Sequence, residues 1–432
     1  NIIKLMYINV FIKSESFILH FLGIIMLKKL LPDKGLLPAE IEKITQDAKK
    51  TALLLEKSLS RNKIDADLFF GGSFAKGTMM KKDMQDIDLF VRFNEKYSEK
   101  ELSNIVEKVI KDAKLKFVRI HGSRDYFRIL GRDFNVEVIP TYRINNVSEA
   151  KNITDLSFFH VEYIKKKLSR APELVKEILL AKSFCYAQGV YGAESYINGF
   201  SGYALELLII YFRGFTNFIK KVASSKDKIV IDIEKSYKNK DEVMMHLNPS
   251  RLQSPIILID PTFKERNALA ALSESTFSRF KDVCAKFLKK PSSEFFVKKE
   301  FDKNEFTKKA KAKKAEFVAL NCSTDRQEGD IAGTKLNKFH RFVIKECSKY
   351  FDIVDEHFIY DGKKVATSYL ILKPKSKIVV KGPPKTSADN LKKFMAKHPD
   401  AYIKGEFACY VEKGFAGFKE FFEKWKAKND KR

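Results

Sequence analysis

The sequence predicts an α+β protein with several domains: a compact α/β head over residues 26–150, a helical central domain over 151–290 and an α+β tail over 291–432. Three observations predict this arrangement. A chain of 432 residues is long enough for two to four domains. Apolar residues make up 44% of it and charged residues 31%, as is typical of globular proteins. Strand and helix periodicities alternate in the head, helical periodicity dominates the central region, and strands return in the tail.

Residues 1–25 are left out of this predicted fold. They begin without Met, and Lys13 and Glu15 interrupt their short apolar patches, so these patches are too broken to cross a membrane. We expect them to be a non-native or misassigned N-terminal extension. The first regular element is an amphipathic helix from Pro38 to about Ser60, in which apolar residues recur at helical spacing.

The composition is strongly basic. The chain has 81 Lys and Arg residues against 55 Asp and Glu, a formal net charge of +26. Such a surface attracts polyanions, and nucleic acid comes first because each phosphate contact releases counterions; an acidic membrane surface comes second. The alternative is drift in an AT-biased genome, which raises the Lys content without any ligand. The five cysteines lack the paired spacing of a zinc site or redox dithiol, and their odd number favours a reduced, cytoplasmic location.

Two aspartates in one predicted strand are the most informative feature of the head. Residues 67–70 predict one strand and residues 86–93 the next. Because side chains in a strand alternate between two faces, Asp86 and Asp88 share one face while their apolar neighbours face a core. Two unpaired carboxylates on one face repel each other, so we expect a cation between them. Oxygen ligands favour Mg²⁺ or Mn²⁺ over zinc. The alternative is a solvated strand face with two incidental aspartates.

A glycine turn and a third acidic residue strengthen the prediction of a site. Gly72 follows the first strand and allows backbone N–H groups to approach a ligand closely, and Ser73 adds a hydroxyl donor, so the turn suits phosphate. A helix is predicted around residues 101–113 and a hairpin over 126–139. In the second strand of the hairpin, Glu137 lies on the face opposite to its apolar neighbours. If this strand lies beside the strand with the two aspartates, Glu137 completes a cluster of three carboxylates.

Three carboxylates beside a phosphate-binding turn are typical of two-metal phosphoryl transfer, in which one Mg²⁺ ion holds a triphosphate and a second activates an attacking 3′-hydroxyl. The chain has no GxxxxGK[ST] motif, which disfavours a P-loop NTPase. The pattern Gly71-Gly72-Ser73, then Asp86 and Asp88, then Glu137 resembles the DNA polymerase β superfamily of nucleotidyltransferases, which includes poly(A) polymerases and CCA-adding enzymes. This resemblance implies a polymerase-β-like head.

A second group of motifs lies in the predicted helical region. Helices are expected from Pro172 to Gly189, after the capping residue Ser201, and over residues 267–288. The motifs are His160, Lys182-Ser183-Phe184, Gly189-Val190-Tyr191-Gly192-Ala193-Glu194, Gly199 to Glu206, Asp260-Pro261 and Arg266-Asn267-Ala268. In this order they resemble the central domain of archaeal-type (class I) CCA-adding enzymes. The likeness extends from about Met26 into the C-terminal region.

The resemblance implies roles for individual residues. Three of them match positions that contact the triphosphate: Ser73, Lys182 and Tyr191. His160 matches a position near the nucleotide, and Arg266 matches an arginine that reads the incoming base together with RNA phosphates. From the residues alone, a lysine in the apolar stripe of a helix could also snorkel or form an ion pair. Without the resemblance, His160 would be interpreted as a structural histidine and Arg266 as a surface residue.

The resemblance also implies the chemistry at the carboxylates. Asp86 and Asp88 match ligands of both metals, and Glu137 matches the residue that helps to activate the primer hydroxyl. In the family this third carboxylate is normally Asp, so Glu137 is one methylene longer.

The tail interleaves lysine with aromatic residues from Phe295 onward. Strands are predicted at residues 316–321, 369–372 and 377–380, and helices at 335–350 and 388–397. The lysines either line a groove for RNA phosphates or form a solvated face over an aromatic core. Lys381-Gly382-Pro383-Pro384 resembles a short motif in the tail of the same family. This implies that the tail binds the acceptor stem and TΨC arm of tRNA by their shape.

The motifs and the resemblance together predict template-independent addition of CCA to the 3′ end of tRNA from CTP and ATP. Two Mg²⁺ ions would assist, and pyrophosphate would be released. The competing hypotheses are a poly(A) polymerase-like enzyme, a tRNA-binding protein whose site has decayed, and a synthase of nucleotide second messengers. A homodimer fits the prediction, and no membrane partner is expected.

Overall fold

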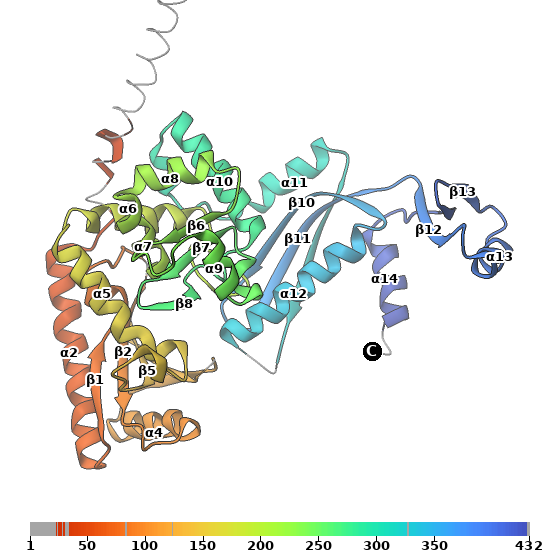
Figure 1. Cartoon of the computed structure of the whole chain (residues 1–432). Helices are drawn as coiled ribbons and strands as arrows, with labels where there is room; N and C mark the ends of the chain where they lie inside the picture. The colour runs from red at the N-terminus through yellow and green to blue at the C-terminus, as the bar shows by residue number, and fades with distance from the viewer. Residues whose placement is uncertain are drawn as a thin grey trace, which may run out of the picture. The chain divides into compact units, whose positions relative to one another are not determined.

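The computed structural model describes residues 23, 25–27, 29–30, 34–82, 84–122, 124–325 and 328–429 (Figure 1). The chain divides into two compact units, residues 1–299 and 300–432. The expected α+β class is confirmed, because helices accompany four separate sheets in the described part. Most of the expected extension over residues 1–25 lies outside the described residues. None of the helices described is both long and apolar enough to span a bilayer. The finer borders at residues 150 and 290 stay predictions.

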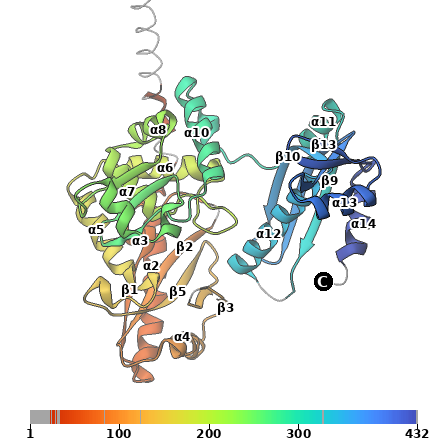
Figure 2. The same cartoon turned by 45° about the vertical axis from the view of Figure 1, so that its right-hand side comes forward.

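The head is built on a five-stranded sheet with strand order β1-β2-β5-β4-β3. Its elements are α2 (Pro38–Arg61), β1 (Ala66–Phe70), α3 (Gly72–Lys76), β2 (Gln85–Phe93), α4 (Glu99–Asp112), β3 (Phe117–Ile120), β4 (Tyr126–Ile129) and β5 (Phe134–Tyr142). β2 and β5 are parallel neighbours, and the other pairs are antiparallel. Side chains of α2 and α4 share one hydrophobic core with the sheet, and Figure 2 shows both helices beside its strands.

Alternation along the two central strands separates a core face from a polar face. The residues of these strands in the shared core are Leu89, Val91, Phe93, Val136, Val138 and Tyr142. Asp86 and Asp88 of β2 and Glu137 of β5 occupy the intervening positions and are half-buried. The sheet therefore presents its acidic residues on the face away from α2 and α4.

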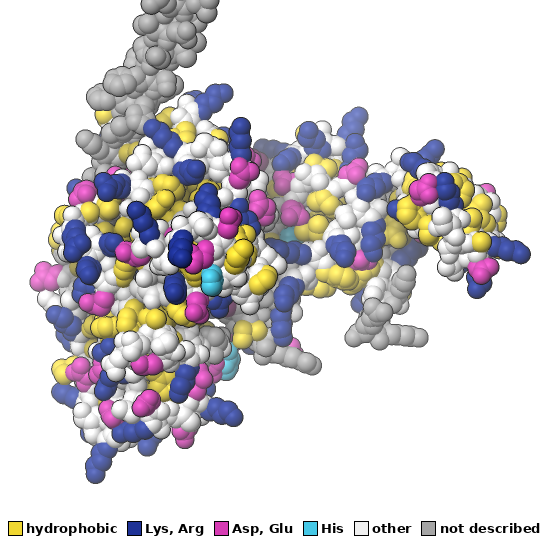
Figure 3. Space-filling model, viewed as in Figure 1, with side chains coloured by type: hydrophobic (Ala, Val, Ile, Leu, Met, Phe, Trp, Pro, Cys, Tyr) yellow, Lys and Arg dark blue, Asp and Glu magenta, His cyan; other side chains and the backbone are white. Residues whose placement is uncertain are grey.

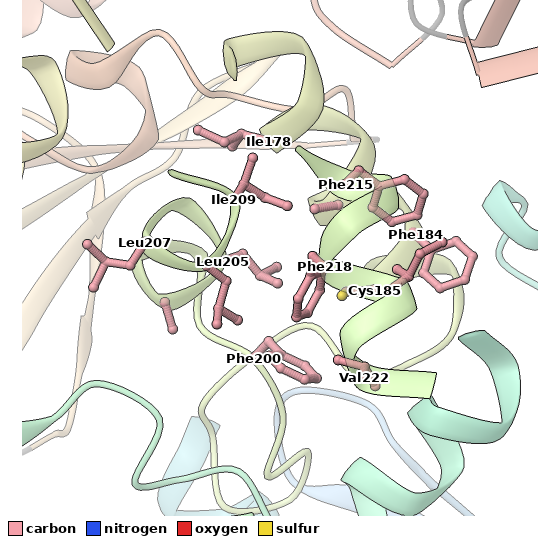
Figure 4. Packing of buried hydrophobic residues seen from close by; sticks show 14 of the residues in the cluster. Ile178, Phe184, Cys185, Phe200, Leu205, Leu207, Ile209, Phe215, Phe218 and Val222 are labelled. Atoms are coloured by element: carbon pink, nitrogen blue, oxygen red, sulfur yellow. The ribbon is translucent and has the colours of Figure 1, made fainter. Parts of the chain in front are cut away.

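The central region packs several helices around a second core. Its elements are η1 (Val147–Glu149), η2 (Ile153–Leu156), α5 (Ser157–Ser169), α6 (Leu174–Ala187), α7 (Gly202–Phe212), α8 (Phe215–Ser224), β6 (Ile229–Asp232), α9 (Lys240–His246), η3 (Pro249–Leu252), β7 (Ile256–Asp260), β8 (Phe263–Asn267), α10 (Glu274–Lys289) and η4 (Ser293–Phe296). Figure 4 shows Phe184, Phe200 and Phe218 among the side chains packed in this core. Ser201 caps α7 as predicted, because its side chain accepts a hydrogen bond from the Ala204 N–H.

The helical pattern expected for residues 151–290 was incomplete in two places. First, β6, β7 and β8 form a three-stranded sheet. All five residues of β7 are buried, and a short apolar run of this kind does not distinguish a buried strand from a helix segment. Second, the helix expected over 267–288 begins only at Glu274. Asn267 instead ends β8, where its side-chain oxygen accepts hydrogen bonds from two backbone N–H groups, and Ser273 caps α10.

The second unit contains two further sheets. Its elements are α11 (Lys303–Ala312), β9 (Glu316–Ser323), α12 (Gly329–Cys347), β10 (Phe351–Tyr360), β11 (Val365–Pro374), β12 (Ile378–Pro384), α13 (Ala388–Lys397), β13 (Tyr402–Lys404), β14 (Phe407–Glu412) and α14 (Phe418–Asn429). The sheets have strand orders β10-β11-β9 and β12-β14-β13. Val343 of α12 and Phe421 of α14 share a core with Leu370 of β11. The predicted strands and helices of the tail are present, whereas β10, β13, β14 and α14 were not predicted.

Candidate active site

The acidic residues predicted from the sequence lie on the two parallel strands at the centre of the head sheet. Asp88 of β2 is the register partner of Glu137 of β5, and Asp86 is the partner of Asn135. The Asn135 amide donates a hydrogen bond to Oδ1 of Asp86 at 3.2 Å. The prediction of a carboxylate cluster required the two strands to be neighbours, and they are.

The environment of Asp88 and Glu137 disfavours the ionised forms of their carboxyl groups. Burial raises the pKa of Asp88 to about 6; the charge of Asp86 raises it further, while Lys76 and Lys82 act in the opposite direction. Burial, followed by the charge of Asp88, raises the pKa of Glu137 to about 7. Acidic groups that resist ionisation in this way mark a place where a cation is favoured.

Arg128 of β4 occupies part of this place. Its guanidinium donates two hydrogen bonds to Oε1 of Glu137, at 2.6 Å from Nη2 and 3.1 Å from Nε. Within the described residues, no three His, Cys, Asp or Glu side chains stand in an arrangement that could hold a metal ion. The donor chemistry nevertheless fits a hard divalent cation, because the groups present are carboxyl oxygens, the ligands that Mg²⁺ prefers. Metal binding by Asp86, Asp88 and Glu137 stays a prediction.

The glycine turn lies directly against the aspartate strand. Gly72 has a φ of +58°, and a β-carbon built on it would lie 1.6 Å from Oδ2 of Asp88. The backbone N–H of Gly71 donates to the Asp88 carbonyl at 2.9 Å. Ser73 follows in α3 and is half-buried. The absence of a side chain at Gly72 therefore allows the turn to approach Asp88 as closely as it does.

Lys182 forms the ion pair that the sequence left open as an alternative. Its side chain is 1% exposed, and its Nζ lies 2.7 Å from Oε1 of Glu206 on α7. The same Nζ donates to the carbonyl and the hydroxyl of Thr78, each at 3.0 Å. The predicted contact between Lys182 and a triphosphate is untested and stays a prediction.

Tyr191 lies next to this ion pair. A β-carbon built at Gly202 would lie 2.9 Å from the Tyr191 hydroxyl and 3.8 Å from Nζ of Lys182. Burial raises the pKa of Tyr191, and the charges of Glu206 and Asp88 raise it further. The hydroxyl is therefore protonated and can act as a hydrogen-bond donor near the carboxylates.

His160 and Arg266 meet at a buried aspartate. Nε2 of His160 lies 3.1 Å from Oδ2 of Asp260, and Nη1 of Arg266 lies 2.5 Å from the same oxygen. The Tyr203 hydroxyl donates to Oδ1 of Asp260 at 3.0 Å, and its ring stacks on His160 with centroids 4.1 Å apart. Burial lowers the pKa of His160, which favours the neutral imidazole. The four side chains form a compact polar group that can present Arg266 and His160 to a ligand.

Lys76 of α3 joins the two parts of the site. Its Nζ lies 2.6 Å from Oε2 of Glu206, and it also lies over the Tyr203 ring at 5.8 Å from the centroid. The structure therefore brings the predicted site residues of the head and the central region into one neighbourhood. The residues of this neighbourhood to which the sequence analysis gave no role are Lys76, Thr78, Lys82, Arg128, Tyr203, Glu206 and Asp260. Lys76, three positions after Ser73, had the clearest available signal, because the same short turn positions both.

One prominent cavity lies elsewhere. It has a volume of about 740 Å³, and its lining includes Lys167, Arg170 and Arg213 but none of the predicted site residues. The candidate active site is therefore identified by converging charges and register and not by cavity size.

Comparison with known proteins agrees with this geometry. A family model described as the nucleotidyltransferase domain matches residues 53–139, and one described as the second domain of tRNA nucleotidyltransferase matches residues 176–297. The CCA-adding enzyme of Nanoarchaeum equitans is 33% identical over 350 residues, which are 80% of this chain and 83% of that protein. The chain belongs to the family of CCA-adding enzymes.

Other CCA-adding enzymes support the same assignment. That of Methanosarcina mazei is 30% identical over 87% of this chain and 82% of its own length. That of Saccharolobus islandicus is 29% identical over 73% of this chain and 72% of its own length. The predicted family and enzyme class are therefore confirmed.

Solved structures support the fold of about two thirds of the chain. A cytoplasmic RNA terminal U-transferase matches with a TM-score of 0.50 and 13% identity, over 65% of this chain and 99% of that chain. The Cid1 poly(U) polymerase matches with a TM-score of 0.51 and 13% identity, over 63% of this chain and 98% of that chain. This CCA-adding family member therefore shares a nucleotidyltransferase fold with terminal transferases, and the likeness concerns the fold alone.

Proposed function

We propose that this protein adds the CCA sequence to the 3′ end of tRNA without a template, using CTP and ATP and releasing pyrophosphate. The observation that carries the proposal is the combination of family membership with an acidic pair in parallel register, Asp88 and Glu137, beside the glycine turn. Both are needed, because membership alone does not tell an active enzyme from one whose site has decayed. The acidic pair, Asp86 and the turn are all present here.

In the proposed reaction, Asp86, Asp88 and Glu137 would hold two Mg²⁺ ions. When bound, these ions supply charge neutralisation at the transferred phosphate and lower the pKa of the primer 3′-hydroxyl. Both Arg128 hydrogen bonds go to Oε1 of Glu137, so Oε2 would be the oxygen that Glu137 contributes to a metal ion. Ser73 and the Tyr191 hydroxyl would donate hydrogen bonds to the triphosphate. The chemistry requires little beyond positioning and electrostatic stabilisation.

The incoming base would lie at the group around Asp260. There Arg266 offers a planar fork of donors that lysine lacks, and neutral His160, whose Nε2–H faces Asp260, offers its other ring nitrogen as an acceptor. Because Asp260 holds both side chains, the base would meet a fixed set of hydrogen-bonding groups. Such a set suits discrimination among the four bases.

The tRNA itself is the proposed partner, held through its acceptor stem and TΨC arm. The chain carries a net charge of +26, and Figure 3 shows Lys and Arg side chains spread over the visible surface with fewer Asp and Glu among them. Double-stranded RNA presents phosphates and 2′-hydroxyls rather than readable bases, so a distributed basic surface matches it.

The experiment is an addition assay with purified protein, Mg²⁺ and a tRNA transcript that lacks CCA. We expect CMP, CMP and AMP in that order, found by sequencing the 3′ ends, and a transcript ending in CC should receive only AMP. Asp88→Asn is the matched control and should add nothing. A homopolymer tail would favour a poly(A) polymerase-like enzyme, and no addition by the wild-type protein would favour a decayed tRNA-binding protein. Products made from nucleotides without tRNA would favour a second-messenger synthase.

A further inference from the structure

Glu206 of α7 holds two lysines that come from different parts of the fold. Its Oε2 lies 2.6 Å from Nζ of Lys76 on α3, and its Oε1 lies 2.7 Å from Nζ of Lys182 on α6. The Thr78 hydroxyl donates to Oε1 at 2.6 Å. One carboxylate therefore receives three donors, two of which carry a positive charge. We call these four residues the Glu206 cluster.

The Glu206 cluster is buried. The side chain of Glu206 is fully buried, that of Lys182 is 1% exposed and that of Lys76 is 6% exposed. Burial alone would raise the pKa of Glu206, but the charges of Lys182 and Lys76 outweigh it and lower the pKa to about 2. Removing one partner from such a group leaves an uncompensated buried charge, which is strongly destabilising. The carboxylate is therefore ionised and is the anion on which both lysines depend.

The position of the cluster is at the nucleotide site and not in a remote core. Lys76 ends the short helix that begins at Gly72, where a built β-carbon would lie 1.6 Å from Oδ2 of Asp88. Lys182 lies beside the Tyr191 hydroxyl, across Gly202. The cluster thus connects the glycine turn of the head to α6 and α7 of the central region.

The hydrogen bonds of Lys182 give the two lysines different tasks. An ammonium group has three N–H donors, and those of Lys182 point to Glu206 and to the carbonyl and hydroxyl of Thr78. Lys182 is therefore fully engaged inside the protein in this conformation. Lys76 approaches Glu206 with one donor and stands at the end of the short helix α3, which begins at the glycine turn.

We propose that Glu206 is a positioning residue for nucleotide binding: it fixes Lys76 and Lys182 so that their positive charge lies where the triphosphate must be held. This inference rests on the proposed function. The cluster carries two positive charges and one negative charge, so it keeps a net positive charge after its internal pairing. Without Glu206 the two ammonium groups would repel each other, and Lys182, whose pKa burial already lowers to about 8, would lose the partner that keeps it protonated.

The test compares substitutions within the cluster. Glu206→Gln removes the charge at nearly constant size, Glu206→Asp keeps the charge but shortens the reach, and Thr78→Val removes only the bridging hydroxyl. For Glu206→Gln we expect KM for CTP and for ATP to rise by about 10-fold or more, and KM for tRNA to stay within about twofold of the wild-type value. The inhibition constant of inorganic pyrophosphate should rise in parallel, because it occupies the same phosphate positions. For Glu206→Asp and Thr78→Val, KM for the nucleotides and the pyrophosphate inhibition constant should lie between those of the wild type and those of Glu206→Gln.

A buried ion pair away from the site supplies the control. Asp155 pairs with Arg124 at 2.6 Å, with side chains 0% and 2% exposed. Asp155→Asn should lower Tm while leaving KM for CTP and the pyrophosphate constant unchanged. If the Glu206 variants lower Tm but leave both constants within about twofold of wild type, Glu206 is only structural and the inference is overturned. Should Glu206→Gln fail to fold, Glu206→Asp and Thr78→Val decide. If the wild-type protein itself adds no CMP to tRNA, the proposed function is wrong, whatever the role of Glu206.

Discussion

Asp88 of β2 stands opposite Glu137 of β5 in the parallel register at the centre of the head sheet. Each carboxyl has a raised pKa, to about 6 for Asp88 and about 7 for Glu137, and burial is the main cause in both. Arg128 reaches Glu137, while Lys76 and Lys82 act on Asp88. The negative charge of the pair can therefore be neutralised either by protons or by a cation. This relationship makes the site testable without any assay of the reaction.

The first prediction concerns stability without metal ions. A carboxyl with a raised pKa in the folded state binds its proton more tightly there than in the unfolded chain, whose values are near 3.8 for Asp88 and 4.5 for Glu137. Its stabilising contribution is therefore complete below the unfolded pKa and is lost as pH rises through the folded pKa. We expect Tm in EDTA to fall between about pH 4 and about pH 7, the span from the unfolded to the folded pKa values, and Mg²⁺ to raise Tm more at the higher pH. Thermal denaturation over this range measures both effects.

Asp88→Asn is the control for that measurement. The variant lacks one of the two carboxyls, so the difference in Tm between Mg²⁺ and EDTA at high pH should shrink. An equal Mg²⁺ effect in both proteins would place the bound cation elsewhere.

The second prediction separates charge from length at the third carboxylate. Glu137→Asp keeps the charge and restores the residue that the family normally has, so we expect activity within about 10-fold of wild type. Glu137→Gln keeps the length but removes the charge, and we expect kcat to fall by about 100-fold or more. Steady-state incorporation of CMP into tRNA compares the two. Equal losses in both variants would mean that Glu137 acts through its shape, as a partner of Arg128, and not through its charge.

The third prediction concerns Gly72. Alanine there would place a β-carbon 1.6 Å from Oδ2 of Asp88, at a φ of +58°, so the turn or the aspartate must move. Gly77 is a matched control, because its φ is +65° and a β-carbon there meets nothing within 4 Å. Both substitutions carry the strain of a left-handed residue, about 1–2 kcal/mol. We expect similar small losses of Tm from that strain, but only Gly72→Ala should also reduce kcat, by about 10-fold or more. Equal kcat values in the two variants would contradict this.

Local patterns were sufficient to predict the acidic strand and the turn before it. The alternation of Asp86 and Asp88 with buried residues is a property of the strand itself, and Gly72 follows directly from the end of β1. Glu137 could be predicted as the third carboxylate only on the condition that its strand lies beside β2. The sequence of neither strand determines whether the two pair or in which register. The sheet of β6, β7 and β8 was missed for a related reason, since β7 is apolar throughout and has no alternation.

The Glu206 cluster could not be predicted from the sequence. Lys76 and Glu206 are 130 positions apart, and only the packing of α3 against the central helices brings them together. The apolar stripe of α6 raised the question of how Lys182 is accommodated, and the sequence left an ion pair as one of the answers. Which acid would supply the partner depended on the tertiary structure.

The last prediction concerns Asp260, which links the residues proposed to read the base. Oδ2 of Asp260 faces Nε2 of His160 and Nη1 of Arg266, while Oδ1 accepts the Tyr203 hydroxyl. Asp260→Asn puts an amide donor where one of these oxygens was, so at least one N–H or O–H group loses its acceptor. We expect a loss of about 1–3 kcal/mol in stability. Tyr203→Phe removes a single hydrogen bond and leaves the carboxylate, so its loss should be smaller.

The two variants should differ most in base selection. When Arg266 is no longer held by a carboxylate, the incoming base meets hydrogen-bond donors whose positions vary. The difference in binding free energy between a correct and a wrong base then becomes smaller. We therefore expect Asp260→Asn to raise the incorporation of UMP and GMP relative to CMP and AMP by about 10-fold, in single-nucleotide assays on tRNA lacking CCA. Tyr203→Phe should change this ratio by less than about threefold. If Asp260→Asn lowers Tm as expected but keeps the wild-type ratio, Asp260 stabilises the fold without setting the position of Arg266.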